Sequence, residues 1–273
     1  MPTKTREQEQ TETFLAIAAT FSTGLYRLYS ARVAALAGLV AIYRAHTVAL
    51  PERDNHPLWE VVEEIINLEY QDYDNSRYLS ELSFLVYATT LFDTFLTETT
   101  RFLFLRHPAA LGDDCPIQVD AVLKARSRFD LLNAVVNKRV RSIANEGFPI
   151  RIRLLKKTFG LRFSLPADVA ESLKHCSTTR NTVVHDQAFY EVYLDSRGRL
   201  SKRSIRCPRH PTPVPSKDFK AAMSVYRQAV WLISDAILVH TLGVEKTSPE
   251  YRAAKGMLAH KKPVPVPVLD EVN

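Results

Sequence analysis

The stretch FLVYATTLFDTFLTETTRFLF, residues 84–104, lies within the longest apolar helix that the sequence predicts, about Arg77 to His107. Its large apolar residues spread around much of the helix circumference, which is typical of a helix covered on most sides. Pro108 ends the predicted helix, because proline has no backbone N–H to continue it. The apolar residues that place this helix at the centre of a bundle are Leu82, Leu85, Val86, Phe92, Phe95, Leu96, Phe102 and Leu103.

Two helices are predicted before this central helix, at residues 11 to about 50 and 58 to about 70. Pro51 and a cluster of turn residues separate them. We therefore expect residues 1–75 to form an N-terminal helical extension. The most apolar run, residues 33–42, is shorter than the roughly 20 residues that a membrane-spanning helix needs. No contact with a membrane is expected.

Four further helices and one β-hairpin are predicted after the central helix. The hairpin is indicated by two short segments around the turn Ser196-Arg197-Gly198. Proline and valine alternate near the C-terminus, which is typical of an extended segment. These patterns predict an all-α fold with a small hairpin, a helical domain over residues 76–245 and a Pro-rich flexible tail over 246–273. The predicted helices span residues 117 to about 140, 151–159, 166 to about 189 and 218–242; the strands span 190–194 and 200–205.

The composition excludes several classes of protein. An apolar share of 46% supports a folded core, and only 8 glycines in 273 residues favour helices. Three widely spaced cysteines argue against a disulfide framework and favour a reducing cytoplasm. His175, Cys176, Cys207 and His210 lack the paired spacing of a zinc site. We therefore expect a cytoplasmic protein without a metal or other cofactor.

The net charge of +6 is distributed unevenly along the chain. Residues 1–100 contain 7 Lys/Arg and 14 Asp/Glu, whereas residues 101–273 contain 29 Lys/Arg and 16 Asp/Glu. A basic C-terminal part indicates a polyanionic partner. The alternative is that the acidic helices pack against the basic part or against a second subunit.

The segment RNTVVHD, residues 180–186, carries the residue types suited to phosphodiester chemistry. Arg180 supplies a permanent cation for a phosphate, His185 a proton carrier near neutral pH, and Asn181 a hydrogen-bonding amide. The RNA 2′-hydroxyl is a built-in nucleophile, so such a site needs no metal. His185 would move the proton, and the products would be a 2′,3′-cyclic phosphate and a 5′-hydroxyl.

The spacing from arginine to histidine is not informative by itself. With 23 Arg and 8 His, roughly two chance matches are expected. The sequence contains three: Arg180 to His185, Arg101 to His107, and Arg203 to His210. Only the first has an amide directly after the arginine, an apolar Val-Val pair between the two residues and a carboxylate directly after the histidine.

Arg180, Asn181 and His185, late in an all-α chain, resemble the motif of the HEPN superfamily: arginine, a polar residue, and histidine after four to six residues. The resemblance covers residues 76–242. It implies a metal-independent endoribonuclease that acts as a homodimer with a composite active site, in a toxin or antiphage-defence setting, with a regulatory or antitoxin partner. It also implies that Arg180, Asn181 and His185 are the catalytic set. One toxin branch has a tyrosine two residues after the histidine, where this chain has Gln187.

Helix geometry constrains how the motif can work. Asn181 and His185 are four residues apart and share a helix face, whereas Arg180 and His185 are about 140° apart on a regular helix. Two alternatives remain open: either the segment is irregular, or two copies of the motif meet across a dimer axis.

Further residues are candidates for supporting roles. Asp186 follows the histidine, and Asp93 lies in a threonine-rich stripe, so either carboxylate would orient the imidazole. The alternative for the stripe is a solvated helix edge. A basic run after the motif would follow an RNA backbone, and its alternative is a solvated hairpin. The predicted RNA-binding residues are Arg197, Arg199, Lys202, Arg203 and Arg206.

Two different functions fit these patterns. The first is an endoribonuclease, and the second is a non-catalytic HEPN-like module that binds nucleic acid or a protein. A purely structural role for the motif, with Arg180 in an ion pair with Asp186 and His185 in the core, is the remaining alternative.

Overall fold

The computed structural model describes residues 5–47, 73–112, 122, 125–185, 190–194, 200–204 and 216–258. Helices dominate these residues, as the sequence predicts, and one antiparallel hairpin is present. No helix among them combines the length and apolarity that crossing a membrane requires. Contacts divide the chain into two compact units. Unit 1 comprises residues 1–24, 89–177 and 222–265, and unit 2 comprises 25–88, 178–221 and 266–273.

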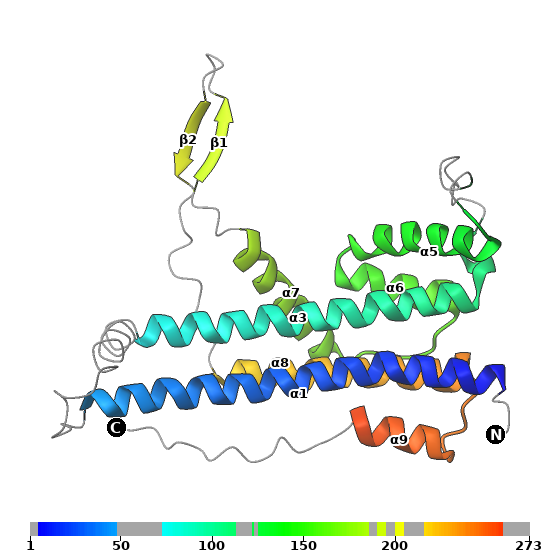
Figure 1. The fold of residues 1–273 in the computed structure, drawn as a ribbon, viewed down its shortest axis with the longest axis horizontal. Coiled ribbons are helices and arrows are strands. Elements are labelled where there is room, and N and C mark those ends of the chain that lie inside the picture. The colour runs from blue at the N-terminus through cyan, green and yellow to red at the C-terminus, as the bar shows by residue number, and fades with distance from the viewer. Residues whose placement is uncertain are drawn as a thin grey trace. The chain divides into compact units, whose positions relative to one another are not determined.

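Two long helices contribute to both units (Figure 1). Helix α1 spans Arg6–Thr47 and helix α3 spans Tyr73–Arg106. Both were predicted from their apolar spacing. The helix predicted at 58–70 lies outside the described residues. In unit 1, the first part of α1 packs along the second part of α3, with ring centroids 5.6 Å apart for Phe14 and Phe102 and 5.7 Å apart for Phe21 and Phe95.

The middle of α3 has the central position that its apolar circumference predicts. Phe92 contacts rings on three sides: Phe95 on its own helix, Phe148 at 5.3 Å and Tyr226 at 5.2 Å. Gly24 of α1 allows a close approach, since a Cβ there would lie 3.0 Å from the side chain of Leu91. Burial of these aromatic side chains is the main stabilising contribution in unit 1.

Two shorter helices cover the end of α3. Helix α5 spans Arg128–Ala144 and helix α6 spans Phe148–Phe159. The sequence predicts one helix from residue 117 to about 140, but residues 125–127 are not helical, and the Ser127 hydroxyl caps α5 by accepting from the Asp130 N–H at 3.1 Å. Residues 117–121 lie outside the described part. The core between α3, α5 and α6 consists of Phe104, Val136, Val140 and Ile143, with Leu154 and Phe159 packed against it.

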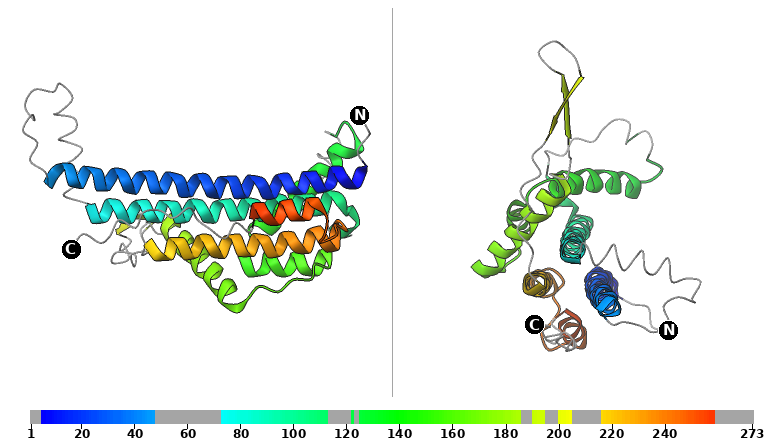
Figure 2. Two further views of the ribbon diagram at one scale, coloured as in Figure 1. Left: turned by 90° about the horizontal axis from the view of Figure 1, so that it is seen from below. Right: turned by 90° about the vertical axis from the view of Figure 1, so that its left-hand side faces the viewer.

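The C-terminal part of unit 1 corrects the predicted tail. Helix α8 spans Ser216–Ala236 and continues into a π-helical turn, η3, at Ile237–Thr241. Pro249–Leu258, predicted as flexible, form helix α9, which packs against α8 and the first part of α1 (Figure 2). Ser248 caps α9, and Tyr251, Ala254 and Leu258 form its buried stripe. Residues 259–273 lie outside the described part.

Unit 2 contains the second part of α1, the first part of α3, the end of the motif helix and the hairpin. Strands β1 (Tyr190–Leu194) and β2 (Leu200–Ser204) pair antiparallel, which confirms the predicted hairpin. Leu25, Leu28 and Leu85 are buried, and Arg32 is buried with them.

Candidate functional site

The candidate motif lies on helix α7, which spans Ala167–His185. Pro166 precedes its first residue, as expected for proline at a helix start. Val169, Leu173 and Cys176 recur at spacings of four and three and are buried in unit 1. The same helix continues into unit 2, where it carries Arg180, Asn181 and His185.

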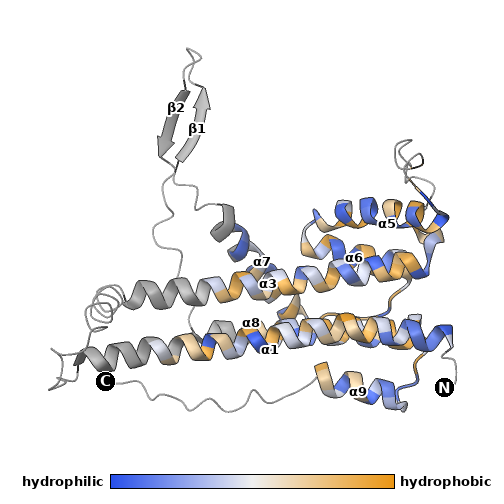
Figure 3. Cartoon of the chain, in the orientation of Figure 1, coloured by the Kyte–Doolittle hydropathy of each residue, from blue (hydrophilic) through white to orange (hydrophobic). Residues whose placement is uncertain are grey.

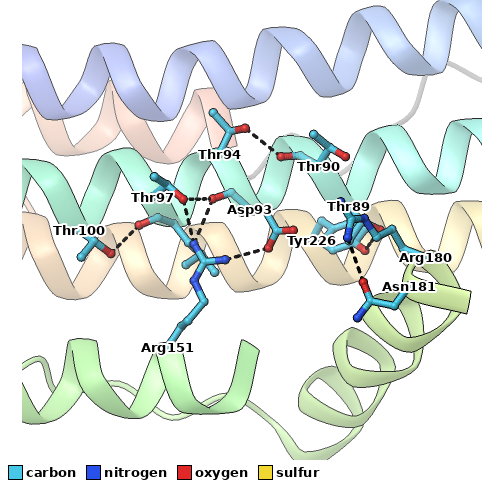
Figure 4. Close-up of polar contacts among 11 residues, drawn as sticks. Thr89, Thr90, Asp93, Thr94, Thr97, Thr100, Arg151, Arg180, Asn181 and Tyr226 are labelled. Carbon is cyan, nitrogen blue, oxygen red and sulfur yellow. Dashed lines mark hydrogen bonds and ion pairs between the residues drawn. The ribbon is translucent and has the colours of Figure 1, made fainter. Parts of the chain in front are cut away.

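Arg180 and Asn181 interact directly. The Arg180 guanidinium donates from Nη1 to the Asn181 side-chain oxygen at 2.9 Å (Figure 4). Asn181 is exposed and Arg180 is partly buried. The Arg180 Nε is buried, and it has no hydrogen-bond partner among the described residues. The amide therefore orients one end of the guanidinium, while other N–H groups remain directed away from Asn181.

His185 is the last residue of α7, and its side chain is outside the described part, as are those of the two valines before it. Asp186 also lies outside the described residues.

The regularity of α7 removes one of the two geometric alternatives. Every residue from Ala167 to His185 is α-helical, with no π or 3₁₀ turn within the motif. The positions of Arg180 and His185 are therefore about 140° apart around the axis and about 7.5 Å apart along it. An irregular backbone therefore does not bring them together.

The second arginine–histidine pair has a different environment. Arg101 forms an ion pair with Glu98, in which Nη1 donates to both carboxylate oxygens at 2.8 Å. Burial and the neighbouring charge of Arg106 lower the pKa of His107. Arg106 itself donates to the Thr241 carbonyl at 3.0 Å. Local contacts thus account for this pair, whereas the guanidinium of Arg180 has no carboxylate partner among the described residues. For the third pair, His210 lies outside the described part.

Asp93 forms an ion pair with Arg151, a residue that no sequence pattern links to it. Arg151 of α6 donates to the Asp93 carboxylate at 3.0 Å, to the Asp93 backbone carbonyl at 3.1 Å and to the Thr97 hydroxyl at 3.0 Å (Figure 4). The Arg151 side chain is only 5% exposed, and burial lowers its pKa. This network fastens α6 to α3. A role for Asp93 in orienting His185 stays a prediction.

The threonine stripe of α3 is partly an interface within unit 1 and partly an exposed edge. Thr89 and Thr100 are buried, whereas Thr90 is exposed. The Thr89 hydroxyl lies 2.7 Å from that of Tyr226, so this end of the stripe contributes to helix packing. Burial raises the pKa of Tyr226, and nearby Cys176 contributes in the same direction. Among the described residues, no group of three or more His, Cys, Asp or Glu side chains is placed to hold a metal ion.

The predicted RNA-binding residues fall on the hairpin and its flanks. Lys202 and Arg203 belong to β2, where they pair in register with Val192 and Glu191; their side chains are outside the described part. Arg197, Arg199 and Arg206 lie outside the described residues altogether.

A second basic region lies on α5 and α6. Residues 125–165 contain ten Lys/Arg and two Asp/Glu, a net charge of +8, which exceeds the net charge of the whole protein. Hydrophilic and hydrophobic residues are mixed along both helices (Figure 3). The sequence shows how basic this segment is, but it does not show which of its cations lie together on the surface.

Comparisons with protein-family models, curated proteins and solved structures found no match to this chain.

Proposed function

We propose that this protein is a metal-independent endoribonuclease whose catalytic residues are Arg180, Asn181 and His185. The observation that carries the proposal is the Arg180–Asn181 pair, in which an exposed amide orients a guanidinium that has no carboxylate partner among the described residues. An arginine with a purely structural role would normally be paired, as Arg101 and Arg151 are. Arg180 instead has N–H groups available for a phosphate.

The proposed reaction follows from the chemistry of RNA. The 2′-hydroxyl attacks the adjacent phosphorus, and the bond from phosphorus to the 5′-oxygen breaks. His185 takes up the 2′-hydroxyl proton or protonates the leaving 5′-oxygen, and Arg180 offsets the negative charge on the phosphoryl oxygens. Asn181 holds the guanidinium in place. The products are a 2′,3′-cyclic phosphate and a 5′-hydroxyl.

The regular α7 helix supports a composite site in a homodimer. Because positions 180 and 185 lie on different sides of one regular helix, the arginine of one copy would act with the histidine of the other. Such a dimer would require two α7 ends to face each other. A toxin or defence setting, with a partner that restrains the enzyme, accords with the family that the motif resembles.

The proposal is tested with RNA in excess EDTA. Purified protein should cut RNA and leave 2′,3′-cyclic phosphate ends, detected by their resistance to direct 3′ ligation. An oligonucleotide with a single 2′-deoxy sugar at the cleavage position should not be cut there, because the nucleophile is missing. Cutting at the deoxy position, or cutting only with added metal, would contradict the proposed chemistry.

A non-catalytic polyanion-binding module is the second candidate, and the basic segment at residues 125–165 favours it. It predicts salt-dependent RNA binding without any cleavage, even at long incubation and high protein concentration. The same EDTA experiment, accompanied by a binding measurement, separates the two functions.

A further inference from the structure

An open hollow of about 580 Å³ lies on α6 and the chain that follows it, within unit 1. Gly160 ends α6 with a φ of +65°, a left-handed conformation that turns the chain back along the helix. This turn brings Arg162 to the same hollow as Arg153, Lys156 and Lys157. The hollow therefore depends on the turn at Gly160, and no pattern in the sequence predicts it.

Four cations surround the hollow, and no acidic residue lines it. Arg153, Lys156, Lys157 and Arg162 are exposed, and none of them forms an ion pair with another described residue. Basic residues near a helix C-terminus complement the helix dipole, but that dipole amounts to only about half a negative charge. Four positive charges exceed what the dipole explains.

The floor of the hollow is formed by apolar side chains that are buried. Ile152 and Leu161 contribute to it and are 8% and 3% exposed. Lys156 is held in place over the Phe163 ring, with 5.5 Å from its Nζ to the ring centroid. An amphipathic surface that inserts into lipid needs projecting apolar side chains, which this hollow lacks. A cationic rim over a shallow apolar floor instead suits a phosphate backbone with a base or sugar lying flat.

We infer that the α6 hollow is a binding site for single-stranded RNA, in which Arg153, Lys156, Lys157 and Arg162 contact consecutive phosphates. Arg153, Lys156 and Lys157 lie at i, i+3 and i+4 and so share one helix face. This inference rests on the proposed function, since it identifies where the RNA substrate is held outside the catalytic motif.

The test measures binding of a 2′-O-methyl RNA oligonucleotide, which lacks a free nucleophile and so cannot be cut by the proposed reaction. The hollow variant Arg153→Gln/Lys157→Gln/Arg162→Gln removes three cations and leaves the Lys156–Phe163 contact intact. Its matched control, Arg128→Gln/Arg139→Gln/Arg141→Gln, removes the same charge from exposed positions on α5. Fluorescence anisotropy at several salt concentrations gives the affinity and its salt dependence, and thermal unfolding verifies that each variant is folded.

In the hollow variant, the slope of log affinity against log salt should decrease by about 2, since each phosphate contact on a single strand contributes about 0.7. Its affinity at moderate salt should fall about tenfold or more. The α5 control should stay close to wild type. Equal losses in both variants would show a diffuse charge effect and overturn the inference, as would no loss in either. Binding to anionic phospholipid vesicles in preference to RNA would also overturn it.

The two proposals fail separately. If the protein does not cut RNA but the hollow variant alone loses the salt slope, the enzyme assignment fails and the binding site stands. If the protein cuts RNA and the hollow variant binds like the control, the site fails and the enzyme assignment stands.

Discussion

At the residue scale, the same residue type has different roles that its contacts reveal. Arg151 is nearly completely buried and donates from its two terminal nitrogens to three acceptors, two of them from Asp93, so it holds helices together. Arg101 is paired with Glu98 on one helix. Arg180 is bonded to an amide only, among the described residues. A guanidinium with unused donors is the one suited to a phosphate.

The Asp93–Arg151 pair gives a prediction that separates a structural role from a catalytic one. Asp93→Ala should lower the free energy of unfolding by about 2 kcal/mol, because the buried guanidinium loses a charged acceptor. Asp93→Asn keeps an amide oxygen and should cost less. Urea denaturation measures both changes. RNA cleavage per folded molecule should remain near wild type, and its loss without a change in unfolding free energy would instead assign Asp93 to the active site.

At the element scale, local periodicity predicted the helices well. Helices α1 and α3, the start of α7 and the hairpin follow from apolar spacing, proline positions and turn residues, which act over a few residues. Helix α9 was missed because the prolines that follow it indicated an extended tail. The Arg151–Asp93 pair was missed because it joins residues 58 positions apart, a contact that no local pattern contains.

At the same scale, two glycine-to-alanine substitutions should change the stability of the protein in opposite directions. Gly160→Ala should destabilise the protein by about 1 kcal/mol, because a φ of +65° is unfavourable for a side chain even though space is available. Gly256→Ala should stabilise it by about 0.5–1 kcal/mol, since Gly256 is inside α9 with nothing near its Cβ position. Thermal unfolding of both variants measures the difference. Changes of the same sign would contradict the assigned helix end.

The docking of α9 has a pH dependence. Burial and the hydrogen bond that Tyr251 donates to Asp235 raise the pKa of the Tyr251 hydroxyl to about 12 from an ordinary value near 10. Between these pH values the unfolded chain releases the proton and the folded chain retains it. The stability that Tyr251 contributes is therefore complete below about pH 10 and is lost as the pH rises towards 12. Denaturation of wild type and Tyr251→Phe at about pH 8 and 11 should show a shrinking difference; a constant difference would exclude this coupling.

At the scale of the whole molecule, the basic charge of the C-terminal part gathers in two segments, residues 125–165 and 197–209. The first of them forms α5, α6 and the chain beside them. Which of these cations share a hollow depends on the turn at Gly160, so composition alone did not identify them. The candidate motif was recognisable because its three residues are close in sequence on one regular helix.

A composite site predicts complementation between inactive subunits. Arg180→Ala and His185→Ala should each be inactive, yet a mixture that exchanges subunits should recover about a quarter of wild-type activity, since half the dimers are mixed and each restores one of two sites. Differently tagged subunits, purified together, verify that mixed dimers form. Mixed dimers without activity would show that each site is built within one chain.

The central claim is that the motif on α7, and not merely the presence of arginine and histidine at this spacing, cuts RNA. The most direct measurement compares RNA cleavage in excess EDTA by Arg180→Ala and His185→Ala with the matched pair Arg101→Ala and His107→Ala. We predict a loss of at least about a hundredfold for each α7 variant. The Arg101 and His107 variants should cleave at close to the wild-type rate, with all four proteins folded. Cleavage that survives both α7 substitutions, or that is lost equally in both pairs, would contradict the account.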